Sequence, residues 1–156
     1  MQTYQIIDLD GCISDDRWRR NLIQPSLIGQ ARFDAYHDLC HKDLALNLNA
    51  VIPGHAIIVI TGRPTRVRER TEVWLREVAG LQISLMIMRN DDETKPAPDL
   101  KRMMVSWLFD ANLYGFLPEQ VVSAIDDRAD VVELYRRDFG LNSRVVRIGD
   151  EEHEHA

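Results

Sequence analysis

Five short apolar runs, separated by longer stretches with helical spacing, constrain the fold of this chain more than any other feature. The runs span residues 3–8, 56–61, 83–88, 121–125 and 144–148, and Gly, Pro, Asn or Asp bounds each of them. Short apolar runs with such residues at their ends are typical of β-strands. Strands that alternate with helices favour right-handed crossovers and a parallel sheet. The sequence therefore predicts an α/β fold with a parallel sheet of five strands.

Three helices are predicted between these runs. Residues 67–78 carry apolar side chains at helical spacing and are followed by Gly80, a typical residue after a helix. A second helix is expected over residues 99–112, after two prolines, and a third over residues 127–139, before Gly140. In the third helix, Asp127 fits the N-cap position and Asp130 fits the first turn. These helix-stabilising roles are an alternative to a chemical role for the two residues.

Two carboxylates stand at the end of the first run. Asp8 and Asp10 are separated by one residue and followed at once by Gly11. Alternation along a strand points both side chains the same way, and two like charges this close are costly unless a cation or a shared proton relieves them. The pair predicts a Mg²⁺ site in which one carboxylate also serves as a nucleophile. The alternative is an ordinary turn after a strand, where Asp and Gly are common.

Polar residues follow two other runs in the same way. Thr61, Gly62 and Arg63 end the second run with a hydroxyl, a permissive glycine and a guanidinium, a combination that suits phosphate. Asp126 and Asp127 follow the fourth run. Ligands of open parallel sheets bind beyond the carboxyl ends of the strands. We therefore expect these groups and the first carboxylate pair at one edge of the sheet.

The order of these motifs resembles that of a known superfamily. Asp8-Leu9-Asp10-Gly11, Thr61-Gly62-Arg63, Lys101 and Asp126-Asp127-x-x-Asp130 look like the four ordered motifs of the haloacid dehalogenase (HAD) superfamily. Residues 73–80 and 124–137 are similar to the 3′-phosphatase domain of phage polynucleotide kinases, and the likeness spans residues 3–147. The resemblance implies the HAD fold, a Rossmann-like three-layer sandwich with a small cap inserted after the first strand.

The resemblance also implies roles for the motif residues. Asp8 would attack phosphorus to form an aspartyl-phosphate, and Asp10 would protonate the leaving oxygen and then activate water. Lys101 would neutralise charge on the nucleophile and the intermediate. Mg²⁺ would be held by Asp8, the Asp10 carbonyl and Asp126, with Asp127 as a further candidate ligand. Substrate contacts are expected from four residues, Arg17, Thr61, Gly62 and Arg63.

Residues 14–53 break the alternation of strands and helices and are expected to form a cap over the site. A helix is predicted around residues 31–39, and the cationic and aromatic side chains of the segment would contact a substrate phosphate or base. The alternative is an arginine-rich solvated face. Residues 1–149 are thus expected to form one domain with this insertion. Residues 150–156 are expected to be a disordered acidic tail, whose two histidines lack the supporting contacts of a metal site.

Composition limits the partners and the compartment. The 156 residues, 45% of them hydrophobic, can bury one core, and the net charge of −6 argues against long, nonspecific nucleic-acid binding but leaves room for a local basic cleft. The chain begins with a strand rather than a leader, its two cysteines lack metal-ligand spacing, and no apolar run reaches the ~20 residues that cross a bilayer. A reduced, cytoplasmic protein without membrane contact is expected. No motif encodes its oligomeric state.

Three features depart from the family pattern. Ala97 stands four residues before Lys101, where the polynucleotide phosphatases carry aspartate, so a supporting carboxylate is either missing or supplied by Asp99. Cys12 takes a place often held by threonine. Because a cysteine phosphatase would need an arginine where Trp18 stands, Cys12 is expected to be a structural thiol. The phosphate-binding loop of a kinase does not occur.

Three functional hypotheses follow. The leading one is a Mg²⁺-dependent phosphomonoesterase that acts on 3′-phosphate ends of nucleic acid or on free mononucleotides. The second is a HAD phosphatase or phosphotransferase for small phosphorylated metabolites, in which a sugar or an acid would contact four residues of the cap, Arg17, Arg19, Tyr36 and His37. The third is a catalytically inactive binding protein that keeps the fold.

Overall fold

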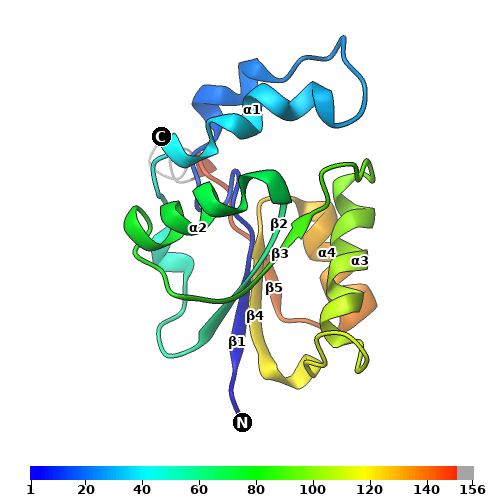
Figure 1. The fold of residues 1–156 in the computed structure, drawn as a ribbon. Coiled ribbons are helices and arrows are strands. Elements are labelled where there is room, and N and C mark those ends of the chain that lie inside the picture. Colours follow the sequence, from blue (N-terminus) through cyan, green and yellow to red (C-terminus); the bar gives the residue numbers. More distant parts are fainter. Residues whose placement is uncertain (151–156) are drawn as a thin grey trace.

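The computed structural model describes residues 1–150, in which five strands form one parallel sheet (Figure 1). They lie in the order β3-β2-β1-β4-β5, and each neighbouring pair is parallel. The predicted α/β fold with a five-stranded parallel sheet is therefore confirmed. The strands are β1 (Tyr4–Ile7), β2 (Ala56–Pro64), β3 (Ile83–Arg89), β4 (Val121–Asp126) and β5 (Ser143–Val145).

Helices cover both faces of the sheet and give the molecule three layers (Figure 1). α2 (Arg68–Glu77) lies on one face, and α3 (Ala97–Phe109) and α4 (Ala129–Phe139) lie together on the other. No helix within residues 1–150 has both the length and the apolar character that a membrane span needs. Because the sheet is covered on both sides, its strands must be apolar on both sides, which explains the continuous apolar runs in the sequence.

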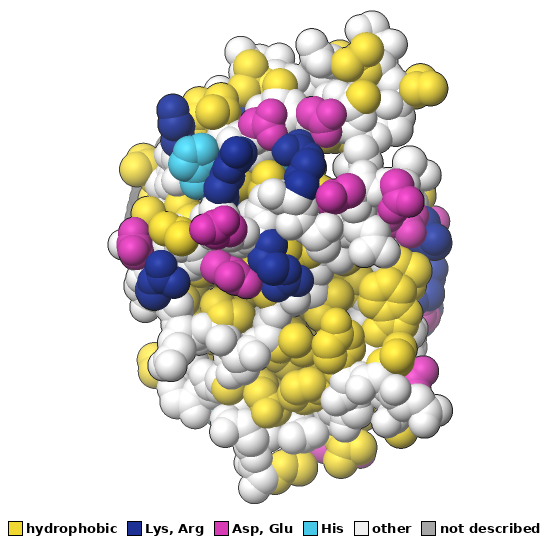
Figure 2. Space-filling model, viewed as in Figure 1, with side chains coloured by type: hydrophobic (Ala, Val, Ile, Leu, Met, Phe, Trp, Pro, Cys, Tyr) yellow, Lys and Arg dark blue, Asp and Glu magenta, His cyan; other side chains and the backbone are white. Residues whose placement is uncertain are grey.

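Charged side chains gather on part of one face of the molecule. Figure 2 shows acidic and basic side chains interspersed above a large group of hydrophobic side chains, with further hydrophobic side chains at the top of this face. A groove of about 790 Å³ lies between α2 and β3 and is lined in part by Leu75, Ile83 and Tyr114. None of the predicted site residues lines this groove.

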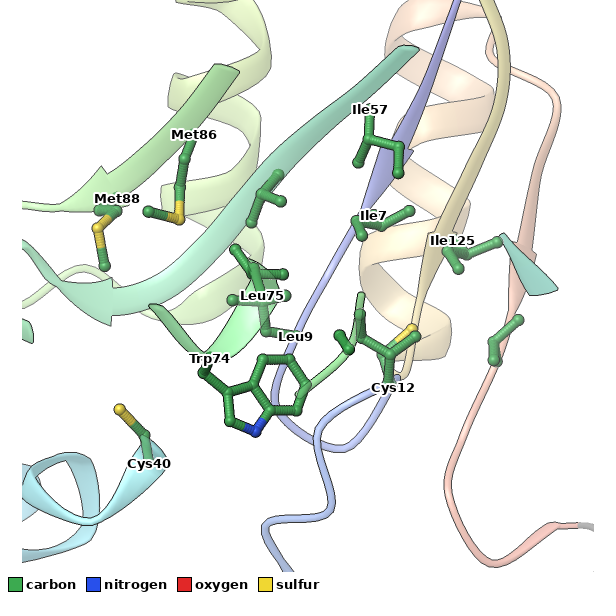
Figure 3. Packing of buried hydrophobic residues seen from close by; sticks show 14 of the residues in the cluster. Ile7, Leu9, Cys12, Cys40, Ile57, Trp74, Leu75, Met86, Met88 and Ile125 are labelled. Atoms are coloured by element: carbon green, nitrogen blue, oxygen red, sulfur yellow. The ribbon is translucent and has the colours of Figure 1, made fainter. Parts of the chain in front are cut away.

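Two apolar cores lie on opposite faces of the sheet. Ile7 belongs to the core beside α2, whereas its neighbour Ile6 belongs to the core beside α3 and α4. Figure 3 shows the first core, in which Trp74 and Leu75 of α2 lie near Ile7 of β1. Cys12 is fully buried in the same core. Burial of these side chains on both faces holds the carboxyl ends of the strands in a fixed arrangement.

The chain between β1 and β2 forms a small helical insertion at the carboxyl ends of the strands (Figure 1). It contains α1 (Asp34–Asp38) and the short 3₁₀ helices Arg17–Leu22, Gly29–Phe33, Cys40–Lys42 and Leu48–Ala50. The helix predicted over residues 31–39 is therefore too long, since only five of its residues are α-helical. Two of those five are buried, and so short an apolar stripe cannot support a longer helix.

Several predicted boundaries were also wrong. α3 begins at Ala97 rather than residue 99, because Pro98 is tolerated in the first turn of a helix. It ends at Phe109, where the Asp110 side chain accepts a hydrogen bond from the backbone N–H of Asn112 and turns the chain. β2 runs on through residue 64, and β5 covers residues 143–145 rather than 144–148. Strand ends depend on pairing with the neighbouring strand, which the apolar pattern does not show.

The start of α4 differs from the prediction in a way that affects the site. The helix begins at Ala129, and Asp127 does not cap it. Instead, Asp126 Oδ1 accepts a hydrogen bond of 3.0 Å from the backbone N–H of Arg128. Gly140 ends the helix in the left-handed conformation, as expected. Asp127 is therefore available for contacts at the end of β4. Of the predicted acidic tail, only Asp150 lies within the described residues.

Candidate active site

The carboxyl ends of three neighbouring strands bring the predicted motifs into one cleft of about 700 Å³. Asp8 follows β1, Thr61 lies in β2 and Asp126 ends β4. Because β1 lies between β2 and β4 in the sheet, these side chains are close although they are far apart in the sequence. The insertion and the segment between β3 and α3 form the outer walls of the cleft.

Three carboxylates meet at the inner end of this cleft. Asp8, Asp126 and Asp127 each offer an oxygen, and these oxygens lie within 4.8 Å of one another. Burial and the neighbouring Asp126 raise the pKa of Asp8 to about 6. Burial and Asp8 raise the pKa of Asp127 to about 9. Both shifts result from negative charges that are crowded away from water, and a divalent cation would relieve them. The donor set therefore fits a metal ion such as Mg²⁺.

Lys101 joins two of these carboxylates from the opposite side. Its buried Nζ donates to Asp8 Oδ1 at 2.8 Å, to Asp126 Oδ2 at 3.0 Å and to the Ile60 carbonyl at 2.7 Å. An ammonium group has three donors, so all of them are used. The suggestion that Asp99 supplies the missing family carboxylate is wrong, because Asp99 is exposed and pairs with Arg102.

Asp10 lies in the same cleft but points its carboxylate away from the cluster. Asp10 Oδ1 accepts hydrogen bonds from Arg19 Nη2 at 2.6 Å and from Arg63 Nη2 at 2.7 Å. Burial alone would raise the pKa of Asp10, but the two guanidinium groups hold it well below its usual range. The expected metal contact of Asp10 rests on its carbonyl oxygen, so it stays a prediction.

The two arginines that hold Asp10 are fully buried. Arg63 also donates to Ser14 Oγ at 2.8 Å and to Thr71 Oγ1 at 3.2 Å. Arg63 does not line the cleft, and no part of its side chain is exposed. Arg63 was predicted to contact the substrate directly, but the structure buries its side chain outside the cleft. It instead fixes the position of Asp10.

Arg19 connects Asp10 to the insertion. Its guanidinium donates twice to the buried Asp43, at 2.8 and 2.6 Å, and once to the Tyr36 carbonyl at 3.1 Å. It also lies 4.2 Å from the centre of the Tyr36 ring. Sequence reasoning gave Arg19 only a possible substrate contact and missed Asp43. No pattern marks this pair, because both residues look like ordinary surface charges.

The remaining predicted contacts divide between the cleft and the outer surface. Thr61 and Gly62 line the cleft. Arg17 does not, and its side chain pairs with Asp15 at 2.9 Å. Asp130 is exposed and pairs with Arg128, so it lies outside the carboxylate cluster. The structure therefore brings Thr61 and Gly62 into the cleft that Asp8 lines and leaves Arg17 outside it.

Two further buried residues near the site, Cys12 and His37, are uncharged at physiological pH. Burial raises the pKa of the Cys12 thiol well above its ordinary value, so the thiol is protonated, in agreement with the predicted structural role. His37 lines the cleft, and its Nδ1 has no hydrogen-bond partner within residues 1–150. Burial lowers the pKa of His37 to about 4, so the ring is neutral at physiological pH.

Gly11 permits the close approach of Asp127. It has a φ of +78°, and a Cβ at this position would lie 2.5 Å from Asp127 Oδ2.

We expect Gly11→Ala to displace Asp127 and to weaken Mg²⁺ binding by about tenfold or more, as measured by isothermal titration calorimetry. Gly140→Ala is the matched control, because Gly140 has a φ of +64° and nothing lies within 4 Å of its Cβ position. It should lose about 1–2 kcal/mol of stability and keep its Mg²⁺ affinity. Equal Mg²⁺ affinities of the two variants would contradict this role of Gly11.

The fold and the site together define a class of protein. A parallel sheet in this order, with an aspartate after β1, another at the end of β4, a threonine in β2 and a lysine in α3, is the arrangement of the HAD superfamily. The sequence profile of the polynucleotide kinase PNKP phosphatase domain matches residues 2–150. The chain therefore belongs to the family of PNKP phosphatase domains within this superfamily.

Solved structures share this fold. A chain of the Pnkp1/Rnl/Hen1 RNA repair complex superposes with a TM-score of 0.69 at 22% identity, over 96% of this chain and 44% of that one. This protein thus spans less than half of that relative. A haloacid dehalogenase-like hydrolase from Streptococcus pneumoniae matches with a TM-score of 0.56 at 13% identity, over 91% and 83% of the two chains. A HAD family enzyme from Bacteroides thetaiotaomicron, solved as a magnesium complex, matches with a TM-score of 0.50 at 12% identity, over 99% and 98%.

Proposed function

We propose that this protein is a Mg²⁺-dependent phosphomonoesterase that removes phosphate from nucleotide-type substrates, either 3′-phosphate ends of nucleic acid or free mononucleotides. The observation that carries the proposal is the contact between Asp8 and Lys101 inside the cleft, beside the carboxylates of Asp126 and Asp127. A carboxylate held by a buried ammonium group, at a site that fits a divalent cation, is suited to attack an electrophilic phosphorus.

The reaction has two halves. In the first, an oxygen of Asp8 forms a bond to phosphorus while the bond to the leaving oxygen breaks. In the second, water attacks the aspartyl-phosphate and releases inorganic phosphate. Lys101 offsets negative charge on Asp8 in both halves, and the hydroxyl of Thr61 donates to a phosphoryl oxygen. When bound by Asp8, Asp126, Asp127 and the Asp10 carbonyl, Mg²⁺ would reduce the repulsion between the carboxylates and the phosphate.

Asp10 is the acid in the first half and the base in the second. The ionised form that Arg19 and Arg63 favour is the form that accepts a proton from the attacking water. The first half needs a protonated Asp10, and the negative charge of a bound phosphate raises the pKa of a neighbouring carboxyl. The two arginines therefore keep Asp10 ionised in the free enzyme, whereas a bound phosphate raises the pKa of Asp10 and favours its protonated form.

Two findings support a nucleotide as the substrate. The family is that of polynucleotide kinase phosphatase domains, and a matching chain belongs to an RNA repair complex. In addition, the outer cleft presents the cations Arg32 and Lys95 and the aromatic ring of Phe33, groups that can contact phosphate and base. The test is phosphate release, with Mg²⁺, from 3′-phosphorylated oligonucleotides, mononucleotides and sugar phosphates. Release from sugar phosphates alone would overturn the nucleotide assignment and favour the metabolite phosphatase.

The pKa shifts predict how Mg²⁺ stabilises the protein at different pH values. The pKa values of Asp8 and Asp127, about 6 and about 9, lie above the ordinary value of 3.8. Their contribution to stability is therefore fully present below about pH 4 and is lost as the pH rises through about 6 and then about 9. Mg²⁺ would bind the ionised carboxylates of the folded protein, and this binding would offset the stability that is lost when they ionise.

We accordingly expect the rise in melting temperature on adding Mg²⁺ to be larger at about pH 8 than at about pH 5. Scanning calorimetry with Mg²⁺ and with a chelator measures this difference. Asp127→Asn should reduce the dependence on pH, because it removes the group with the higher pKa. A Mg²⁺ effect that is the same at both pH values would contradict binding at this cluster.

A further inference from the structure

Arg89 ends β3 and projects its guanidinium into the cleft beside Gly62. Its Nε donates to the Gly62 carbonyl at 3.1 Å, and its Nη1 donates to the carbonyls of Glu93 and Lys95 at 3.2 and 2.9 Å. Its Nη2 lies 3.8 Å from the position that a Cβ on Gly62 would occupy. The side chain is therefore fixed at three points and lines the cleft.

The charge of Arg89 has no carboxylate partner among residues 1–150. All three of its hydrogen bonds go to neutral carbonyls. The acidic side chain that most affects it, Glu93, is paired with Lys95 at 3.3 Å. Partial burial lowers the pKa of Arg89, which is the direction expected for a cation that is not neutralised. By contrast, Arg128 in the same cleft is paired with Asp130. A fixed, partly buried cation without a counter-charge is suited to bind an anion.

The position of Arg89 in the sheet separates it from the carboxylate cluster. The carboxylate cluster lies at the ends of β1 and β4, whereas Arg89 comes from β3, two strands away from β1. Neighbouring strands are about 4.8 Å apart, and the guanidinium contacts the Gly62 carbonyl on β2. Arg89 and the Asp8 carboxylate thus come from strands that β2 separates. This placement favours an anion other than the phosphate that Asp8 would attack.

We propose that Arg89 binds the phosphodiester next to the terminal phosphate of an oligonucleotide, so that the enzyme prefers nucleic-acid ends to free mononucleotides. This inference rests on the proposed function and chooses between its two substrate classes. Lys95, whose carbonyl Arg89 holds, lines the same part of the cleft, but its ammonium group is paired with Glu93, so the subsite rests on the charge of Arg89. The net charge of the protein is negative, so such a subsite would have to be local, as it is here.

The test compares kcat/KM for a 3′-phosphorylated oligonucleotide with that for a nucleoside 3′-monophosphate. Arg89→Gln should lower the value for the oligonucleotide by about tenfold or more and leave the value for the mononucleotide within about twofold. Its plot of log(kcat/KM) for the oligonucleotide against log salt should become shallower by about 0.7, the contribution of one phosphate contact to a single strand. Arg89→Lys, which keeps the charge, should retain most of the salt dependence.

Arg68→Gln is the matched control. Arg68 also donates to a carbonyl of β3, that of Met86 at 3.1 Å, but it lines the groove beside α2 rather than the cleft. This variant should leave the ratio of the two substrates unchanged. If Arg89→Gln changes neither substrate, or lowers both equally, the inference is overturned and the proposed function stands. If the wild-type protein releases phosphate from neither substrate, the proposed function fails, and the inference fails with it.

Discussion

Asp8→Asn is expected to lower the rate of phosphate release by at least about a thousand-fold. The amide keeps the shape of the carboxylate but cannot form the aspartyl-phosphate, and removal of a nucleophile has effects of this size or larger in other hydrolases. It also removes one of three crowded carboxylates, so the folded protein should not be destabilised in the absence of Mg²⁺. Phosphate release under saturating Mg²⁺ and a thermal melt measure the two effects.

Asp130→Asn provides the control for this substitution. Asp130 belongs to the same acidic motif as Asp126, but its side chain is exposed and pairs with Arg128 outside the cluster. This variant should keep activity within about twofold of the wild type. A folded Asp8→Asn protein that remains active would show that Asp8 is not the nucleophile. Equal losses in the two variants would show that negative charge near the site, rather than the position of Asp8, is what matters.

Arg19→Met is expected to lower the free energy of unfolding by about 3–5 kcal/mol. The guanidinium is fully buried and makes ion pairs of 2.6 Å with both Asp43 and Asp10. Removing one partner of a buried ion pair is costly because the other charge stays buried, and the fully buried Asp43 carboxylate would keep only a longer contact of 3.7 Å with Arg63 among the ion pairs of residues 1–150. Urea denaturation followed by circular dichroism measures the loss. Activity should also fall, because Asp10 loses one of the two groups that orient it.

The neighbouring Arg20 is the control for Arg19. It pairs with Asp16 at 2.8 Å, but half of its side chain is exposed, and exposed ion pairs contribute about 0–1 kcal/mol. Arg20→Met should therefore cost far less than Arg19→Met. Replacing both members of the buried pair, as in Arg19→Met with Asp43→Leu, should cost less than the sum of the single substitutions. If Arg19→Met costs no more than Arg20→Met, the buried pair does not contribute as its geometry indicates.

The sheet and the convergence of the site residues at its edge could be predicted because these residues follow local rules. Apolar runs mark strands that are buried on both faces, and a parallel sheet brings the residues after those strands to one edge. Asp8, Thr61 and Asp126 each stand at such a strand end, so their convergence follows from the order of the strands. Lys101 had no local rule of this kind, and its role came from the resemblance to the HAD superfamily.

The contacts of Asp10 could not be predicted because they depend on buried charges from distant parts of the chain. Arg19 stands among other cations in residues 17–20, a composition that usually marks a solvated surface. Asp43 and Arg63 are 24 and 44 residues from Arg19. Whether a charged side chain is solvated or paired inside the protein is decided by tertiary packing. The sequence alone therefore pointed Arg63 at the substrate, whereas the structure turns it toward Asp10.

The attachment of the insertion through Arg19 has a consequence for protein engineering. Arg19, Tyr36 and Asp43 join the insertion to Asp10, whereas residues 24–32 contribute none of these contacts. A chimera that exchanges only residues 24–32 for the corresponding loop of another phosphatase would therefore keep the contacts that hold Asp10. A graft of the whole of residues 14–53 would replace those contacts together with the loop. The smaller exchange is the better starting point for redirecting specificity.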